Sequence, residues 1–130
     1  MENITQVIAR IFLGHIFLLA GVNKIIGYSG TQGYMDAMGV PGMLLPLVIL
    51  LEIGAGLAIT IGWKTRWNAV ALALFTLAAG ILFHNKISDQ TQMIMLMKNI
   101  AITGGLLLLA VHGAGAYSID ESFGKKTAAG

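Results

Sequence analysis

A single carboxylate lies in the middle of a long apolar stretch of the sequence. Glu52 falls near the centre of residues 43–62, MLLPLVILLEIGAGLAITIG. A charged side chain at the centre of a lipid bilayer costs about 2.5–3.5 kcal/mol on insertion scales, so this carboxylate must face the protein interior and find a partner, or carry a proton. The sequence offers Arg10, Lys24 and Lys98 as partners, and it does not single out one of them.

The basic residues are expected on either side of Glu52 in depth, at a rise of about 1.5 Å per helical residue. Arg10 is expected below Glu52 and Lys98 above it, with Lys24 and His84 nearer to the upper surface. One interpretation is that paired charges fix the register of the helices and do no chemistry. The other is that the upper basic groups line a pocket for an anionic or polar head group, with Glu52 at its floor. Both interpretations stay open.

Four apolar runs must position these residues. They cover about residues 4–26, 43–62, 68–84 and 93–111. A helix needs about 20 apolar residues to cross a hydrocarbon core of roughly 30 Å. Only 11% of the residues are charged, whereas soluble domains carry about 25%. The sequence therefore predicts an all-α membrane protein with one domain over residues 1–112, a bundle of four transmembrane helices. A flexible polar C-terminal tail is expected over residues 113–130.

The distribution of basic residues predicts the orientation. Lys64, Arg66, Lys125 and Lys126 lie on the side of the termini, and Lys24 and Lys86 lie on the opposite side. By the positive-inside rule, both termini are expected in the cytoplasm. The first run has no basic residue before Arg10 and only a poor cleavage site, which favours a retained helix over a cleaved signal peptide.

Two connections carry further expectations. The long one, residues 27–41, is expected to contain a short helical turn from Thr31 to Met38, with Tyr34 and Met35 dipping into the membrane interface. The short one, WKTRW at residues 63–67, is basic and flanked by tryptophans, a pattern typical of an interfacial anchor.

Composition argues against several kinds of chemistry. The chain has no cysteine, which excludes thiolate nucleophiles, disulfide exchange and iron–sulfur clusters. His15, His84 and His112 fall at different depths and lack metal-binding spacing, so neither haem nor a metal is expected. There is no GxGxxG fingerprint of a dinucleotide site. The small net charge of +2 does not suggest nucleic acid as a partner.

The motifs also occur in a recognisable order. They are RIFLGHIFLLAGVNKI, a loop ending in YMDAMGVP, a span with a central Glu followed by GAGLAITIGWKTR, a span ending in FH, and a span beginning with Lys98-Asn99. This order, from Arg10 to Leu109, resembles the DoxX family of small bacterial inner-membrane proteins. The resemblance implies four transmembrane helices in the bacterial inner (plasma) membrane, and some members are linked to quinone-reducing or terminal oxidase systems. By motif match, the family-like polar set is Arg10, Lys24, Glu52, His84, Lys98 and Asn99.

Three functions are compatible with these observations. The leading hypothesis is a non-catalytic or accessory membrane subunit, with no catalytic residue of its own, that holds a quinone or a lipid head group beside a membrane redox complex. The first alternative is a small transporter or exporter that uses Glu52 for proton coupling and forms a homo-oligomer. The second alternative is a structural protein that maintains membrane integrity.

Overall fold

The structure, a computed structural model, describes residues 2–84, 88–115 and 117–120, and all regular elements in them are helical. The elements are α1 (Glu2–Ile26), α2 (Tyr28–Ala37), the 3₁₀ turn η1 (Gly42–Leu44), α3 (Leu45–Ile61), α4 (Thr65–Phe83) and α5 (Gln90–His112). The segments 2–26, 42–61, 65–83 and 90–112 are long and apolar enough to cross a membrane. The all-α class and the four spans expected from the sequence are therefore confirmed.

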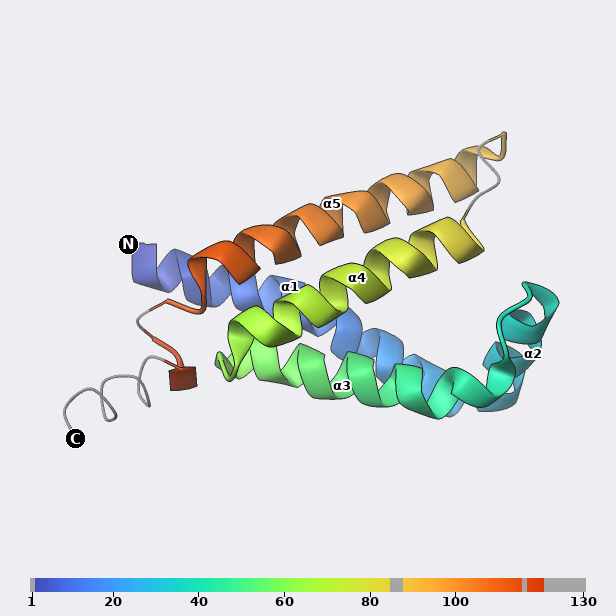
Figure 1. Ribbon diagram of the computed structural model, residues 1–130, viewed down its shortest axis with the longest axis horizontal. Helices are drawn as coiled ribbons and strands as arrows, with labels where there is room; N and C mark the ends of the chain where they lie inside the picture. Colours follow the sequence, from blue (N-terminus) through green and yellow to red (C-terminus); the bar gives the residue numbers. More distant parts are fainter. Residues whose placement is uncertain (1, 85–87, 116, 121–130) are drawn as a thin grey trace.

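The helices associate as two pairs. Helix α1 packs along α3 and α4 packs along α5, whereas α3 meets α4 less extensively and α1 barely touches α5. Figure 1 shows the α1–α3 pair and the α4–α5 pair diverging toward the end that carries α2. The start of α1 and the end of α5 lie together at the opposite end, as an even number of spans requires. This divergence leaves room between the pairs at the α2 end.

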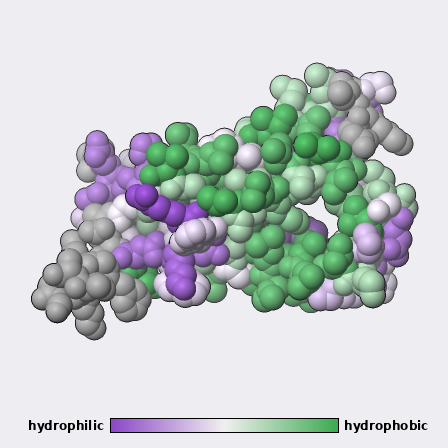
Figure 2. All heavy atoms as spheres, viewed as in Figure 1, coloured by the Kyte–Doolittle hydropathy of each residue, from purple (hydrophilic) through white to green (hydrophobic). Residues whose placement is uncertain are grey.

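The outer surface of the bundle is apolar. Phe12, Leu74 and Leu108, from three different helices, are each more than 60% exposed. Figure 2 shows hydrophobic residues over the middle of the molecule and hydrophilic ones gathered toward its ends. Monomeric soluble proteins rarely expose apolar patches of this extent, because water disfavours them. The surface is therefore suited to contact with lipid.

Small residues bring α1 and α3 into close contact. A Cβ atom on Gly56 would lie 3.2 Å from the carbonyl oxygen of Gly14 and 3.1 Å from the Cβ of Phe17. Membrane helices use such residues to increase van der Waals contact, since lipid removes the hydrophobic driving force between them. Beside this contact lies the core cluster Phe17, Ala55, Ile59, Ala69, Leu72, Ala73 and Leu106.

The connection after α1 is more helical than expected. Helix α2 begins at Tyr28, where the sequence predicted a turn from Thr31. Only Gly27 separates α1 from α2. The hydroxyl of Thr31, which lies in α2, donates a hydrogen bond to the carbonyl of Gly27 at 2.9 Å. The ring of Tyr34 stacks on that of Phe83 with the centroids 5.5 Å apart. Helix α2 therefore packs against the end of α4.

Candidate functional site

Lys24 of α1 and Glu52 of α3 form an ion pair at the α2 end of the bundle. The Lys24 Nζ atom lies 2.7 Å from the Glu52 Oε1 atom, and the two side chains are 29% and 3% exposed. Of the three partners that the sequence left open, the structure selects Lys24. A buried carboxylate needs such compensation, because an unpaired charge in a low-dielectric interior is strongly destabilising.

The approach of α1 to α3 makes this pair possible. Gly21 lies one turn before Lys24, and a Cβ atom on it would be 3.5 Å from the Cβ of Glu52 and closer still to Ile53. A larger residue at position 21 would therefore push α1 away from the carboxylate. The spacing of Gly21 and Lys24 on one helical face places the glycine at the contact and the ammonium group just beyond it.

A cavity of about 450 Å³ lies between the two helix pairs above this ion pair. Lys24, Glu52, His84, Lys98 and Asn99 all line it. Five of the six polar residues singled out from the sequence therefore meet in one place. The remaining wall is mostly apolar and aromatic, with side chains such as Ile16, Phe17, Met35, Val48, Phe75, Leu82 and Phe83. Ligand sites of this size usually combine apolar walls with a few placed polar groups.

Polar groups of α4 and α5 form the side of the cavity opposite the ion pair. The Asn99 side-chain amide donates from Nδ2 to the backbone oxygen of Thr76 at 3.1 Å. The Thr76 side chain is 4% exposed, and its hydroxyl has no hydrogen-bond partner in the part of the chain that the structure describes. A buried hydroxyl without a partner carries a desolvation penalty of about 1–3 kcal/mol. Because Thr76 lines the cavity, a bound ligand could satisfy it.

Two further basic residues lie toward the mouth of the cavity. The His84 Nδ1 atom is 2.8 Å from the Gln92 Oε1 atom, which links the end of α4 to the start of α5. Lys98 lies on α5 and is exposed. Both residues line the cavity together with Lys24. The site is therefore rich in hydrogen-bond donors around one central carboxylate.

The cavity lies where the two helix pairs part. Figure 2 shows the molecule hollowed at the α2 end, between the part formed by α4 and α5 and the part formed by α3 and α2. Hydrophobic residues surround most of this hollow. The hollow lies on the side of the bundle, among helices that would be embedded in lipid. A lipophilic molecule in the bilayer could therefore reach the polar groups from the side.

Arg10 does not join this site, although depth estimates placed it beneath Glu52. Its guanidinium donates to the backbone oxygen of Thr60 at 3.2 Å and to that of Tyr117. The side chain is buried, at 2% exposure. Arg10 therefore ties the C-terminal segment and the end of α3 to α1, at the end opposite the cavity. The position of Arg10 along α1 predicted its depth in the membrane, but it did not predict the direction of its side chain.

The contributions of α2 and of Thr76 to the cavity were not predicted from the sequence. Tyr34 and Met35 line the cavity instead of only dipping into the interface. The stripe Leu72, Thr76, Gly80 and His84 on α4, at intervals of four residues, was the signal for Thr76. Leu72, Thr76 and Gly80 are buried and His84 is partly buried, so this stripe faces inward. No comparable spacing identifies Tyr34.

The described residues contain no group of three or more His, Asp or Glu side chains that could hold a metal ion. The site instead offers cationic and neutral hydrogen-bond donors, one carboxylate and aromatic walls. This set is suited to binding a polar head group with acceptor oxygens.

The fold and the site thus define a small integral membrane protein with four spanning helices and a mostly apolar cavity that holds a few polar groups. The family model for DoxX matches residues 5–85, which is more than half of the chain. The chain belongs to the DoxX family. The matched residues include Arg10, Lys24, Glu52 and His84, whereas Lys98 and Asn99 follow the matched region.

Related proteins support the same membership. The chain is 52% identical over 126 residues to the Inner membrane protein YqjF of Escherichia coli (strain K12), covering 97% of both chains. It is 37% identical to the Inner membrane protein YphA of the same organism, covering 88% of this chain and 86% of that one. A more distant relative, 27% identical over 59% of this chain and 58% of its own, is named Putative oxidoreductase CatD of Bacillus subtilis (strain 168). No solved structure gives a significant match. The protein is thus an inner-membrane protein of this family.

Proposed function

We propose that the cavity binds the head group of a lipophilic quinone, and that the protein acts as a non-catalytic accessory subunit beside a membrane redox complex. The observation that carries this proposal is the meeting of Lys24, Glu52, His84, Lys98 and Asn99 in one apolar-walled cavity. The name of the distant relative CatD, which refers to an oxidoreductase, is consistent with a redox context.

The chemistry of a quinone head group fits this lining. A quinone presents two carbonyl oxygens, which accept hydrogen bonds, on a flat ring that packs against apolar and aromatic side chains. Lys24 has an ammonium group with three N–H donors, and only Glu52 is paired with it among the described residues. The unpartnered Thr76 hydroxyl is a second donor, on α4. The isoprenoid tail would leave through the lateral hollow into the bilayer.

The position of the cavity favours binding over transport. The cavity lies toward the α2 end, whereas at the other end Arg10 bonds to Thr60 and Tyr117 across the bundle. A transporter needs a continuous path between the two sides, and among the described residues this cavity shares no lining residue with the space beside Arg66 at the opposite end. A flux into proteoliposomes that depends on Glu52 would favour the transporter alternative instead.

Quinone that copurifies with the protein tests the proposal. The protein is extracted gently from inner membranes into lipid nanodiscs, and bound small molecules and proteins are identified by mass spectrometry. A quinone in stoichiometric amount is expected in the unmodified protein and strongly reduced in Glu52→Gln. The matched control is Glu2→Gln, which makes the same change at an exposed residue outside the cavity. A protein that carries only bulk lipid would contradict the proposal.

The orientation belongs to the same proposal. Lys64 and Arg66 lie at the end where α1 begins and α5 ends, which favours this end in the cytoplasm by the positive-inside rule. The quinone site would then lie toward the periplasmic side of the membrane.

A further inference from the structure

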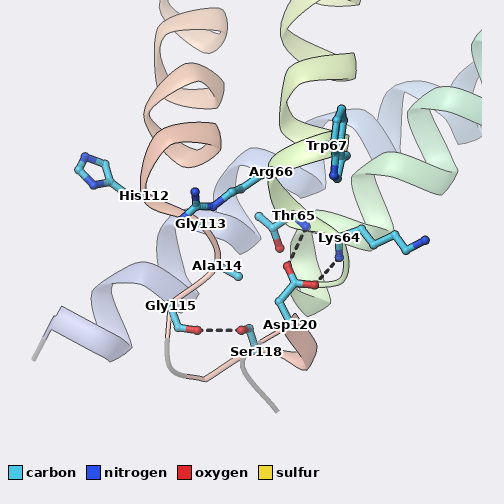
Figure 3. Close-up of a pocket in the computed structure, with 10 residues that line it drawn as sticks. All are labelled: Lys64, Thr65, Arg66, Trp67, His112, Gly113, Ala114, Gly115, Ser118 and Asp120. Atoms are coloured by element: carbon cyan, nitrogen blue, oxygen red, sulfur yellow. Dashed lines mark hydrogen bonds between the residues drawn. The ribbon is translucent and has the colours of Figure 1, made fainter. Parts of the chain in front are cut away.

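A second cavity lies at the end of the bundle opposite the quinone site, between the start of α4 and the end of α5. Its volume is about 500 Å³. Figure 3 shows Arg66 reaching from α4 toward Gly113, where α5 ends. The Arg66 Nε and Nη2 atoms lie 3.1 and 3.3 Å from the position that a Cβ on Gly113 would take. This glycine, with a φ of 78°, therefore leaves room for the guanidinium.

The Arg66 guanidinium is available to a ligand. Its side chain is exposed, and no described residue forms an ion pair or hydrogen bond with it. Asp120 is the one carboxylate among the described residues of the lining. Both of its oxygens are occupied, one by the backbone N–H of Lys64 and the other by that of Thr65 at 2.8 Å. Figure 3 shows these two bonds directing the carboxylate toward the start of α4. Asp120 therefore caps a helix and does not pair with Arg66.

A second donor in the wall also lacks a partner. The Thr65 side chain is fully buried, at 0% exposure, and its hydroxyl makes no hydrogen bond to any described residue. Thr65 lines the cavity between Arg66 and Asp120 (Figure 3). An unpaired buried hydroxyl is costly, and an incoming acceptor oxygen would remove that cost. This observation is independent of the charge on Arg66 and indicates a ligand with acceptor oxygens.

The surroundings of the cavity indicate a ligand from the membrane. Trp67, which is 80% exposed, lines the cavity, and Trp63, which is 45% exposed, precedes the start of α4. Tryptophan gathers in the layer of lipid head groups, where its ring has both apolar and polar surroundings. Lys64 also lines the cavity, but its ammonium lies over the Trp63 ring, 5.1 Å from the centroid, and Figure 3 shows its side chain pointing away from Arg66 and Thr65. Arg66 is therefore the basic side chain that faces inward.

We infer that this cavity binds the phosphate group of an anionic phospholipid. The planar guanidinium of Arg66 matches two phosphate oxygens, a geometry that lysine cannot reproduce. The Thr65 hydroxyl supplies one further bond. The acyl chains of the lipid lie along the apolar outer surface of α4 and α5, beside Trp67. This site is separate from the quinone cavity and does not depend on it.

Quenching of Trp67 by brominated lipid tests the inference. The chain has two tryptophans, so Trp63→Phe leaves Trp67 as the only one. This protein is placed in nanodiscs that contain a small fraction of either brominated phosphatidylglycerol or brominated phosphatidylcholine. Phosphatidylglycerol is expected to quench more strongly. Arg66→Gln should lower the enrichment by roughly fivefold, the contribution of about one basic side chain near a membrane surface. Thr65→Val should lower it less.

The control separates a built site from general electrostatic attraction. Lys125→Gln removes one positive charge that is expected on the same side of the membrane as Arg66, at a position outside the described residues, and should leave the quenching ratio unchanged. Equal quenching by the two lipids, or an equal loss in Lys125→Gln and Arg66→Gln, would overturn the inference. Inorganic phosphate added to phosphatidylcholine nanodiscs should not alter Trp67 fluorescence. A saturable change that Arg66→Gln abolishes would assign the site to soluble phosphate and overturn the lipid assignment.

Discussion

Lys24 and Glu52 join α1 to α3 through an ion pair of 2.7 Å between Nζ and Oε1, at the floor of the cavity. The pair thus serves two purposes in this account. It compensates a buried carboxylate, and it holds an ammonium group where a ligand can accept further hydrogen bonds from it. The sequence left open whether the charged residues only fix the register of the helices or also bind a ligand. Both interpretations involve Lys24 and Glu52, and they predict different results for mutants.

The first prediction concerns mutants of this ion pair. Lys24→Met should strongly lower the thermal stability of the purified protein, because it leaves the buried Glu52 carboxylate without a partner. Breaking a fully buried pair costs about 3–5 kcal/mol. The cost here should be smaller, since Lys24 is partly exposed. The double variant Lys24→Met with Glu52→Gln should recover most of the stability. It should not recover bound quinone. Recovery of both stability and quinone would show that the pair only fixes helix register.

The second prediction concerns the unpartnered hydroxyl of Thr76. Thr76→Val keeps the shape of the side chain and removes a group that makes no hydrogen bond within the described structure. Thermal stability should therefore stay the same or rise. Quinone affinity should fall by roughly tenfold if the hydroxyl donates to the ligand, since about 1.4 kcal/mol corresponds to that factor.

Thr103→Val is the matched control for Thr76→Val. The Thr103 hydroxyl donates to the backbone oxygen of Asn99 at 2.8 Å on the same helix, and Thr103 does not line the cavity. Titration of a short-chain quinone into nanodiscs compares the two variants directly. Equal affinities for Thr76→Val and the unmodified protein would remove Thr76 from the site.

The third prediction concerns the close contact of α1 and α3. A Cβ on Gly14 would lie 2.8 Å from the backbone oxygen of Gly56, so Gly14→Ala must separate the helices. The expected cost is about 1–3 kcal/mol, which is typical of overpacking. Gly54→Ala is the control, because nothing lies within 4 Å of a Cβ built there. Heating followed by size-exclusion chromatography should show an earlier loss of Gly14→Ala only. Equal curves would refute the packing account.

The fourth prediction concerns the orientation of the chain. A reporter that is active only in the cytoplasm, fused after residue 130, should be active, and a reporter that needs the periplasm should be inactive at the same position. The reason is that Lys64 and Arg66 lie at the end of the bundle where α1 begins and α5 ends, and that Lys125 and Lys126 follow α5 in the sequence. The reverse pattern would place the cavity at the α2 end toward the cytoplasm.

Much of the fold was predictable from the sequence because lipid imposes simple rules. Runs of apolar residues of the required length identify the four spans, and the charge of Glu52 requires an inward position. Helical spacing aligned Gly21 with Lys24 on one face, and the structure places this face on α3.

The rest was not predictable, since it depends on how the helices turn and part. Arg10 and Lys24 lie on the same face of α1, so periodicity could not distinguish them. Lys24 pairs with Glu52, whereas Arg10 donates to the backbone oxygen of Tyr117. The cavity exists because the α1–α3 and α4–α5 pairs diverge, and no short motif encodes such an angle. The stacking of Tyr34 on Phe83 likewise depends on the path of the chain after Gly27.

Photochemical labelling in lipid tests the central claim most directly. A quinone with a diazirine on its head group is reconstituted with the protein in nanodiscs, irradiated, and the attachment site is found by mass spectrometry. We expect saturable labelling of cavity residues such as Phe75, Leu82 and Ile102, which an excess of unlabelled quinone prevents. Labelling spread over lipid-facing residues such as Phe12 and Leu74, unaffected by competing quinone, would contradict it.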